Sequence, residues 1–145
     1  YKKTFLDDKH KAQFKLMVDQ DLMVECNEHY ITQLLDNLIS NADKYGENSL
    51  IKISLRRMNS IMVEFKITDH GIGIPKEELS DIFKSFTTSS KTRTSAGGRG
   101  LGLALCQKVI DAHQGKILAE SDNENGTTFL FVIPIHYHYK ALWLK

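Results

Sequence analysis

Apolar residues recur along this chain with two periods, which separate predicted helices from predicted strands. Between residues 28 and 45 they follow a helical spacing, at Ile31, Leu34, Leu35, Leu38, Ile39 and Ala42. The spacing predicts a helix that Asn27 caps and Gly46 ends. A second helix is predicted over residues 100 to 113, and a short one over residues 77 to 83, after Pro75.

Shorter stretches that are rich in alternating or β-branched residues are typical of strands. They lie at residues 12 to 18, 22 to 26, 50 to 57, 61 to 68, 116 to 120 and 127 to 135. Polar turns join them in pairs, at residues 19 to 21, 58 to 60 and 122 to 126. Because the strands come in adjacent pairs with helices between them, the pattern favours an α+β fold over a doubly wound parallel sheet.

The composition indicates one domain, residues 1 to 145, in which 41% of the residues are hydrophobic and 26% charged. The net charge of +1 gives no electrostatic reason to expect nucleic acid as a partner. No apolar run approaches the ~20 residues of a membrane helix, so we expect no direct membrane insertion. The absence of an initiating Met suggests a fragment of a longer protein. Cys26 and Cys106 are expected to be buried free thiols in a reducing cytoplasm.

The first polar motif lies on the long predicted helix. Asn37, Asn41 and Lys44 follow the spacing i, i+4, i+7 beside the apolar stripe, with Tyr45 at the boundary. Two carboxamides and an ammonium on one line could hold a hydrated Mg²⁺ and the phosphates that it bridges, since this cation prefers oxygen ligands. A solvated polar face explains the same pattern, and the helix alone does not decide between the two.

The second motif follows the strand predicted at residues 61 to 68 and reads Asp69-His70-Gly71-Ile72-Gly73-Ile74-Pro75. Its glycines would let a ligand approach the backbone, and an inward carboxylate could accept a hydrogen bond from the amino group of a base. An ordinary turn is the alternative, because Gly and Asp are common turn residues.

The third motif joins a polar loop to a glycine-rich helix start. Residues 87 to 98 are almost wholly Thr, Ser, Lys, Arg, Ala and Gly, so we expect a mobile loop there. It leads into Gly98-Arg99-Gly100-Leu101-Gly102 at the predicted helix N-terminus, where free N–H groups favour a phosphate. Lys91, Arg93 and Arg99 could add positive charge, although a solvated basic loop has the same composition.

Taken in order, these motifs closely resemble the ATP-binding catalytic domain of sensor histidine kinases. The superfamily also includes gyrase, heat-shock chaperone and mismatch-repair ATPases. The resemblance covers about residues 12 to 135 and leaves 136 to 145 as a C-terminal tail. Its four boxes correspond to residues 37 to 45, 69 to 73, 82 to 86 and 98 to 102, with an ATP lid between the last two. It implies a two-layer α/β sandwich, in which a mixed sheet of about five strands packs on about three helices.

The resemblance implies ATP and Mg²⁺ as cofactors and assigns roles to the motif residues. Asn41 and Asn37 would hold Mg²⁺, Lys44 would meet phosphate, and Tyr45 would lie against the adenine or ribose. Asp69 would accept the adenine amino group. The further residues implied at the nucleotide are Gly71, Gly73, Ile74, Phe86, Arg93 at the γ-phosphate, Gly98, Gly100, Leu101 and Gly102. Phe83 and Phe86 would anchor the lid to the core.

Position 37 bears on the reaction. By resemblance, the relatives that hydrolyse ATP carry Glu there, whereas kinases carry Asn, and an amide cannot act as a general base. We therefore expect transfer of the γ-phosphate, with Asn37, Lys44 and Arg93 as the catalytic residues. The acceptor would be a histidine on the dimerisation helices of the same full-length kinase, acting as a homodimer in the cytoplasm, with a response regulator downstream. A membrane anchor in the full-length protein is compatible with this expectation.

None of the six histidines stands in an acceptor motif, so the acceptor helices and any sensor are expected outside this fragment. Two alternatives stay open. One is a serine kinase or binding module of the same fold, similar to anti-sigma factors. The other is a degenerate domain that no longer binds nucleotide. An ATP-hydrolysing machine comes last, because position 37 is not Glu.

Overall fold

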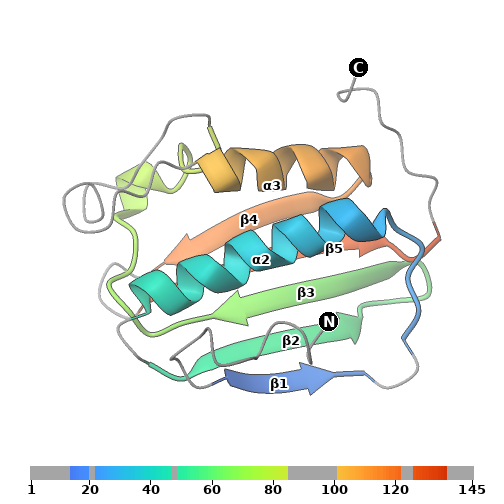
Figure 1. The fold of residues 1–145 in the computed structure, drawn as a ribbon, viewed down its shortest axis with the longest axis horizontal. Coiled ribbons are helices and arrows are strands. Elements are labelled where there is room, and N and C mark those ends of the chain that lie inside the picture. Colours follow the sequence, from blue (N-terminus) through green and yellow to red (C-terminus); the bar gives the residue numbers. More distant parts are fainter. Residues whose placement is uncertain (1–13, 20–21, 47–48, 85–100, 122–125, 137–145) are drawn as a thin grey trace.

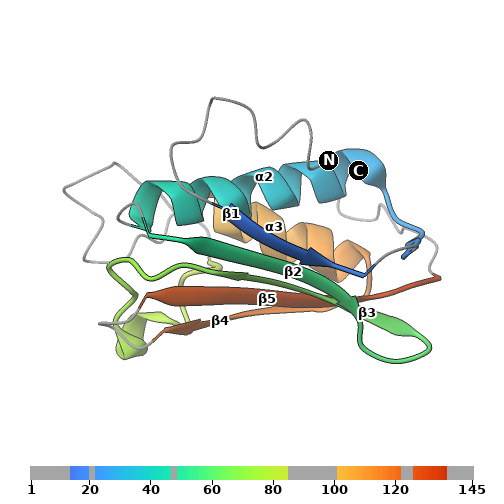
Figure 2. The same ribbon diagram turned by 90° about the horizontal axis from the view of Figure 1, so that it is seen from below.

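The computed structural model describes residues 14–19, 22–46, 49–84, 101–121 and 126–136. In this part of the chain, two α-helices pack on one face of a five-stranded sheet (Figures 1 and 2). The elements are β1 (Phe14–Val18), α2 (Glu28–Tyr45), β2 (Ile51–Arg57), β3 (Met62–Thr68), the 3₁₀ helix η1 (Lys76–Glu78), α3 (Leu101–Ala112), β4 (Lys116–Ser121) and β5 (Thr127–Pro134). The predicted two-layer α+β sandwich is confirmed.

The strand order is β1-β2-β3-β5-β4, and the sheet is mixed. β1 pairs with β2 in parallel, and the other neighbouring strands are antiparallel. A parallel pair needs a crossover between its strands, and α2 provides it. The same end of the sheet therefore holds the start of β2, the ends of β3 and β4, the start of β5 and the C-terminus of α2 (Figure 1).

The helix α2 begins and ends where the sequence predicts. The Asn27 side chain accepts a hydrogen bond from the Tyr30 N–H at 3.1 Å, and Gly46 follows the last helical residue. The buried residues of this helix share the predicted apolar stripe: Leu34, Leu38, Ile39 and Ala42. They pack with the inward-facing residues of the sheet, in which the rings of Phe65 and Phe131 stack at 4.8 Å. This contact between the helix layer and the sheet forms the core.

Residues 22–26 do not form the predicted strand. Strand β1 pairs with β2, and residues 22–26 instead lead from the sheet to the start of α2. The Glu25 N–H donates to the Ile135 carbonyl oxygen at 2.8 Å during this passage. Leu22 and Val24 alternate because one side of the segment rests on the core, and burial on one side resembles a strand in the sequence.

The predicted helix over residues 77 to 83 is also wrong. Only η1 is helical there, and hydrogen bonds between residues three apart continue as turns, for example from the Asp81 N–H to the Glu78 carbonyl oxygen at 3.0 Å. So short a segment gains too few hydrogen bonds to offset helix nucleation. Of the three expected helices, two are therefore α-helices in the described part of the chain, and the third is a single 3₁₀ turn. Residues 12–13, the loop at 87–98, most of the turn at 122–126 and the tail from residue 137 lie outside the described residues.

The two cysteines differ, contrary to the prediction that both are buried. Cys106 is fully buried on α3, and burial raises the pKa of its thiol to about 12. Cys26 is exposed, because the segment that carries it passes along the surface instead of joining the sheet. Only Cys106 therefore acts as a small apolar core residue.

Candidate functional site

Asp69 directly follows β3, and three hydrogen bonds to Thr127 and Gly71 fix its position. Its N–H donates to the Thr127 carbonyl oxygen at 2.9 Å, and its own carbonyl oxygen accepts from the Thr127 N–H at 3.3 Å. Its carboxylate oxygen Oδ1 accepts from the Gly71 N–H at 2.9 Å. Asp69 is only 5% exposed, so a buried carboxylate has a fixed direction at the end of the sheet. Fixed, partly desolvated acceptors are suited to recognising a ligand donor.

The segment after Asp69 lies directly against the C-terminus of α2. The Ile72 N–H donates to the Tyr45 carbonyl oxygen at 3.3 Å. A Cβ at Gly71 would lie 2.0 Å from the Tyr45 carbonyl oxygen and 2.6 Å from the Gly46 Cα. Gly71 is therefore required by backbone packing of the loop on the helix, a role that differs from the predicted access of a ligand. The contact joins the motif on α2 to the motif after β3.

A second glycine, Gly126, packs against the backbone of Asp69. Gly126 has φ of +95°, and a Cβ there would lie 2.2 Å from the Asp69 carbonyl oxygen. Only glycine adopts this conformation readily while allowing so close an approach. The turn before β5 is thus pressed against the backbone of Asp69.

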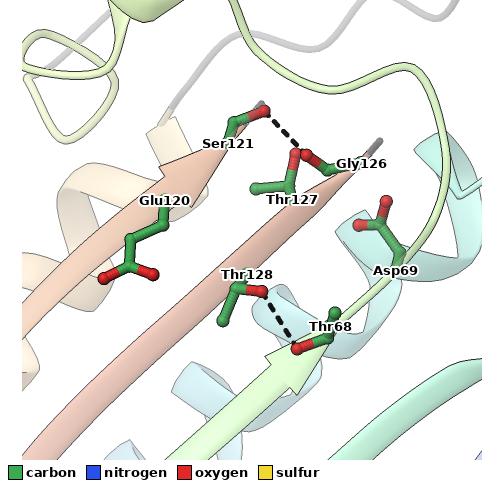
Figure 3. Close-up of a pocket in the computed structure, with 7 residues that line it drawn as sticks. All are labelled: Thr68, Asp69, Glu120, Ser121, Gly126, Thr127 and Thr128. Carbon is green, nitrogen blue, oxygen red and sulfur yellow. Dashed lines mark hydrogen bonds between the residues drawn. The ribbon is translucent and has the colours of Figure 1, made fainter. Parts of the chain in front are cut away.

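A cavity of about 320 Å³ lies at this end of the sheet (Figure 3). Its lining comes from the ends of β3, β4 and β5: Thr68, Asp69, Glu120, Ser121, Gly126, Thr127 and Thr128. The hydroxyl groups of Thr68 and Thr128 lie 3.0 Å apart. The Ser121 hydroxyl accepts from the Ile74 N–H at 2.7 Å and donates to the Gly126 carbonyl oxygen at 2.7 Å. These hydrogen bonds hold the loop after Asp69 against β4.

Thr127 and Ser121 are site residues that the sequence reasoning missed. Thr127 is buried and faces the helix layer, in the same row as Phe129, Phe131 and Ile133. A polar residue at an apolar position of an alternating strand was the available signal, since buried polar groups need a partner. For Ser121 the sequence offers no comparable signal, because its partners come from a loop and a turn far from it along the chain.

The polar residues of the first box, residues 37 to 45, which we call the N box, project from α2 at different depths. Asn37 and Asn41 are half-buried, whereas Lys44 is exposed, with its Nζ 5.7 Å from the centre of the Tyr45 ring. The side chain of Asn37 reaches α3, where its hydrogen bond to the Cys106 thiol partly opposes the effect of burial on the pKa of Cys106. Burial also raises the pKa of Tyr45, so its phenol stays neutral near pH 7. Asn37 thus faces the helix–helix contact more than the predicted polar stripe implies.

The structure brings Tyr45, Gly46, Asp69 and Gly71 into contact, and Ile74 joins them through Ser121. Gly73 lies in the same loop with φ of 70°. The N-terminus of α3 at Leu101 lies at this end of the molecule (Figure 1). The side chain of Leu101 is not among those described, and neither is anything of Phe86, Arg93, Gly98 and Gly100. Gly102 lies in the first turn of α3. Phe83 meets Phe129 edge to face at 6.3 Å.

The chain is similar in sequence to one protein family and to several known proteins. Residues 26–137 match the family described as histidine kinase-, DNA gyrase B- and HSP90-like ATPase. The chain is 36% identical over 140 residues to the sensor histidine kinase WalK of Bacillus subtilis (strain 168), covering 94% of this chain and 23% of WalK. It is 40% identical over 121 residues to the histidine-protein kinase ArlS of Staphylococcus epidermidis (strain RP62A), covering 82% of this chain and 26% of ArlS.

Among solved structures, the nucleotide-free catalytic domain of the histidine kinase ThkA is similar, with a TM-score of 0.74. The identity is 38%, and the match covers 86% of this chain and 80% of that domain.

The chain therefore belongs to the family of histidine kinase-, DNA gyrase B- and HSP90-like ATPases. Within that family its relatives are sensor histidine kinases, and it corresponds to their ATP-binding catalytic domain. The chain spans about a quarter of the length of the curated relatives it matches.

Within the described residues, no helix is both long and apolar enough to cross a membrane. No group of three His, Cys, Asp or Glu side chains gathers there as a possible metal site.

Proposed function

We propose that this domain binds Mg²⁺-ATP at the Asp69 end of the sheet. It then transfers the γ-phosphate to a histidine on the dimerisation helices of the full-length kinase, which acts as a homodimer and passes the phosphate to a response regulator. The observation that carries the proposal is the buried Asp69 carboxylate, fixed by the Gly71 N–H and placed against the end of α2.

Adenine recognition rests on Asp69. The exocyclic amino group of adenine is a donor, and an ionised carboxylate is purely an acceptor, so the two are complementary. The Gly71 N–H already holds Oδ1, which fixes the direction of the carboxylate before the nucleotide arrives. Thr127 is buried beside Asp69 and supplies a hydroxyl near the same base. A preformed acceptor of this kind reduces the ordering that binding requires.

The amides of Asn41 and Asn37 on α2 are proposed to hold a magnesium ion, for which Asn37 would turn from its contact with Cys106 of α3. Asn37 and Asn41 lie one helical turn apart, and their amide oxygens are the hard ligands that Mg²⁺ accepts together with water and phosphate oxygens. Mg²⁺ would neutralise charge on the phosphates. Lys44, exposed one turn beyond Asn41, can reach a phosphate from the same helix.

Position 37 argues for transfer of the phosphate and against hydrolysis. An activated water needs a general base, and the amide of Asn37 has no proton affinity near neutral pH. Phosphoryl transfer depends chiefly on positioning and charge neutralisation, which these residues can supply. A histidine brought in by the partner helices would then be the nucleophile, and the γ-phosphate would move from the β-phosphate oxygen to a ring nitrogen. Arg93 is proposed to contact the γ-phosphate from the lid. The backbone N–H groups of residues 98 to 102 are proposed to contact the other phosphates of ATP.

Calorimetry with a non-hydrolysable ATP analogue tests the binding site, in Mg²⁺ and again in EDTA. We expect saturable, Mg²⁺-enhanced binding that Asp69→Asn weakens and Asn41→Ala makes less dependent on Mg²⁺. Asp111→Asn, an exposed change of the same chemistry on α3, is the matched control and should bind normally. Absence of binding by the unaltered chain would favour the degenerate domain.

Phosphotransfer is tested by mixing the chain with a dimeric histidine-bearing helical hairpin and radiolabelled ATP. Label that is lost in acid and kept in base identifies a phosphohistidine and supports the proposal. Label that is stable in acid identifies a phosphoserine and favours the alternative similar to anti-sigma factors. Release of free phosphate without labelled protein would mean hydrolysis.

A further inference from the structure

The face of the sheet opposite the helices has an unusual distribution of side chains. Both α-helices lie on the other face, and no helix of the described residues covers this one, which we call the outer face (Figure 2). The residues of the outer face can be identified from the alternation along each strand. On β5, for example, buried residues that face the helices alternate strictly with partly exposed residues that face outward. A solvated face of an antiparallel sheet is expected to be mainly polar.

The middle of the outer face is apolar instead. The residues that form this strip lie on β3, β5 and β4: Met62, Leu130, Val132, Pro134 and Leu118. Leu118 is 42% exposed, and Leu130 is its direct partner across the β4–β5 pair. These side chains gain nothing from the core, since the core lies on the other face of the sheet.

Cations border this strip on both sides. Lys66 is the direct partner of Leu130, and Lys116 is the direct partner of Val132. On the neighbouring strands, Lys15 stands opposite Lys52 in the parallel β1–β2 pair, a like-charge pairing that opposes sheet formation. With Arg56, five cations share this face.

Among the residues that the structure describes, two carboxylates lie on the outer face with these cations. Glu64 is committed to Arg56, at 3.0 Å from the guanidinium Nε, and Glu120 lies at the end near the cavity. The face is therefore clearly basic, although the whole chain has a net charge of only +1. Between Lys66 and Lys116, Leu130 and Val132 are only partly exposed.

We propose that the outer face binds an amphipathic helix of a partner protein, with an apolar stripe that is bordered by carboxylates. The apolar strip runs along β5, with Met62 and Leu118 beside it on β3 and β4 and lysines on both flanks, an arrangement that suits the apolar stripe of an amphipathic helix. A membrane surface fits less well, because a membrane-binding surface inserts its apolar side chains into the lipid boundary, whereas Leu130 and Val132 in the middle of this strip are only partly exposed. On β5 the strip runs from Leu130 to Pro134, five residues that span about 16 Å, the length of a helix of about 11 residues, so an 18-residue helix covers it with room at both ends.

The test uses a synthetic 18-residue peptide with leucines along one helical face and glutamates on both flanks. Three controls accompany it: the same peptide with lysine flanks, a scrambled acidic peptide, and phosphatidylcholine vesicles containing phosphatidylglycerol. Fluorescence anisotropy measures affinity for the 145-residue chain, and amide chemical shifts in NMR locate the contact. We expect the acidic amphipathic peptide to bind at least about tenfold more tightly than either control peptide. The shifted amides should lie on β3, β5 and β4.

The variants Lys52→Glu/Lys66→Glu and Leu118→Gln should each weaken binding of the acidic peptide, the first by about tenfold or more. Lys76→Glu/Lys108→Glu changes two exposed lysines of η1 and α3 and should leave it unchanged. Thermal unfolding checks that all variants are folded. The proposal is overturned if the peptides bind equally or not at all, if the shifts lie on α2 and α3, or if only the vesicles bind.

Discussion

The two ends of the sandwich each contain a buried polar side chain that links elements far apart in sequence, but they use it differently. At the site end, Asp69 is 5% exposed and lines a cavity. At the opposite end, His113 is 1% exposed and lies between α3 and the start of α2. Its Nε2 accepts from the Asn27 N–H at 3.0 Å, and its Nδ1 lies 2.7 Å from the Val109 carbonyl oxygen. The contacts with backbone assign the proton to Nδ1.

The comparison leads us to propose different roles for the two buried polar groups, one in the fold and one in binding. His113 is enclosed by backbone groups, so it fastens two helices and needs no further molecule. Asp69 accepts a hydrogen bond from the Gly71 N–H and lines the cavity at the end of the sheet. Changes to the Asp69 carboxylate should therefore affect binding and changes at the opposite end should affect stability, whereas a change at Gly71, which packs the loop on α2, should affect both. Five predictions test this division, in order of decreasing expected effect.

The largest effect is expected for Gly71→Ala. The added Cβ would lie 2.0 Å from the Tyr45 carbonyl oxygen, a backbone atom that cannot rotate away. We expect a loss of about 3 kcal/mol or more in the free energy of unfolding, together with loss of nucleotide binding. Urea unfolding followed by circular dichroism measures the loss, with Ser60→Ala in the exposed β2–β3 turn as control. Unchanged stability would show that the loop does not pack on α2.

Asp69→Asn should separate binding from stability. Asparagine keeps an oxygen for the Gly71 N–H, but its amino group cannot accept from adenine. We expect affinity for the ATP analogue to fall by about 100-fold, since a buried acceptor has become a donor. The free energy of unfolding should change by less than about 1 kcal/mol. Equal affinities of the variant and the unaltered chain would refute the assignment of Asp69.

His113→Phe tests the opposite end. Phenylalanine fills similar space but leaves the Asn27 N–H without the His113 acceptor. The expected cost is about 2 kcal/mol in the free energy of unfolding, the usual penalty for a buried donor that loses its partner. Nucleotide affinity, measured at a temperature where the variant is folded, should stay within about twofold of the unaltered chain. A large loss of affinity without loss of stability would break the division between the ends.

The stability contributed by His113 should depend on pH. Burial lowers the pKa of His113, and the hydrogen bond to Val109 opposes this effect only in part. The unfolded chain therefore binds a proton at a higher pH than the folded chain does. Stability from this residue is fully present above the unfolded pKa of about 6.5 and is lost as the pH falls through the lowered folded pKa, by at most about 1.4 kcal/mol per pH unit. The dependence should be reduced in His113→Phe when unfolding is measured from pH 7.5 to 5.

The smallest effect is expected for Asn27→Ala. The substitution removes the side-chain acceptor for the Tyr30 N–H but leaves the backbone N–H that binds His113. Loss of an N-cap costs about 1 kcal/mol, and Asn27→Ser should recover most of it. Differential scanning calorimetry of the two variants makes the measurement. A loss as large as that of His113→Phe would mean that the cap and the histidine act as one unit.

Local patterns predicted the local structure well. The bounds of α2, its Asn27 cap and its Gly46 end are readable because each depends on residues a few positions apart. The hairpins β2–β3 and β4–β5 were predicted for the same reason, and the Asp69 and N-box motifs were found by their spacing. The strand at residues 22–26 was wrong, because burial on one side alone does not reveal whether a segment has a strand beside it.

By itself, the sequence determined the two α-helices, the strand alternation of the two hairpins, the family and most, but not all, of the polar residues of the proposed site. Only the tertiary structure decided that β1 runs parallel to β2, that Gly71 packs on Tyr45, and that Thr127 lies beside Asp69. It also decided that Asn27 and His113, 86 residues apart, share a hydrogen bond. The physical reason is that periodicity and capping act within a few residues, whereas these contacts form only when the sheet brings distant segments together.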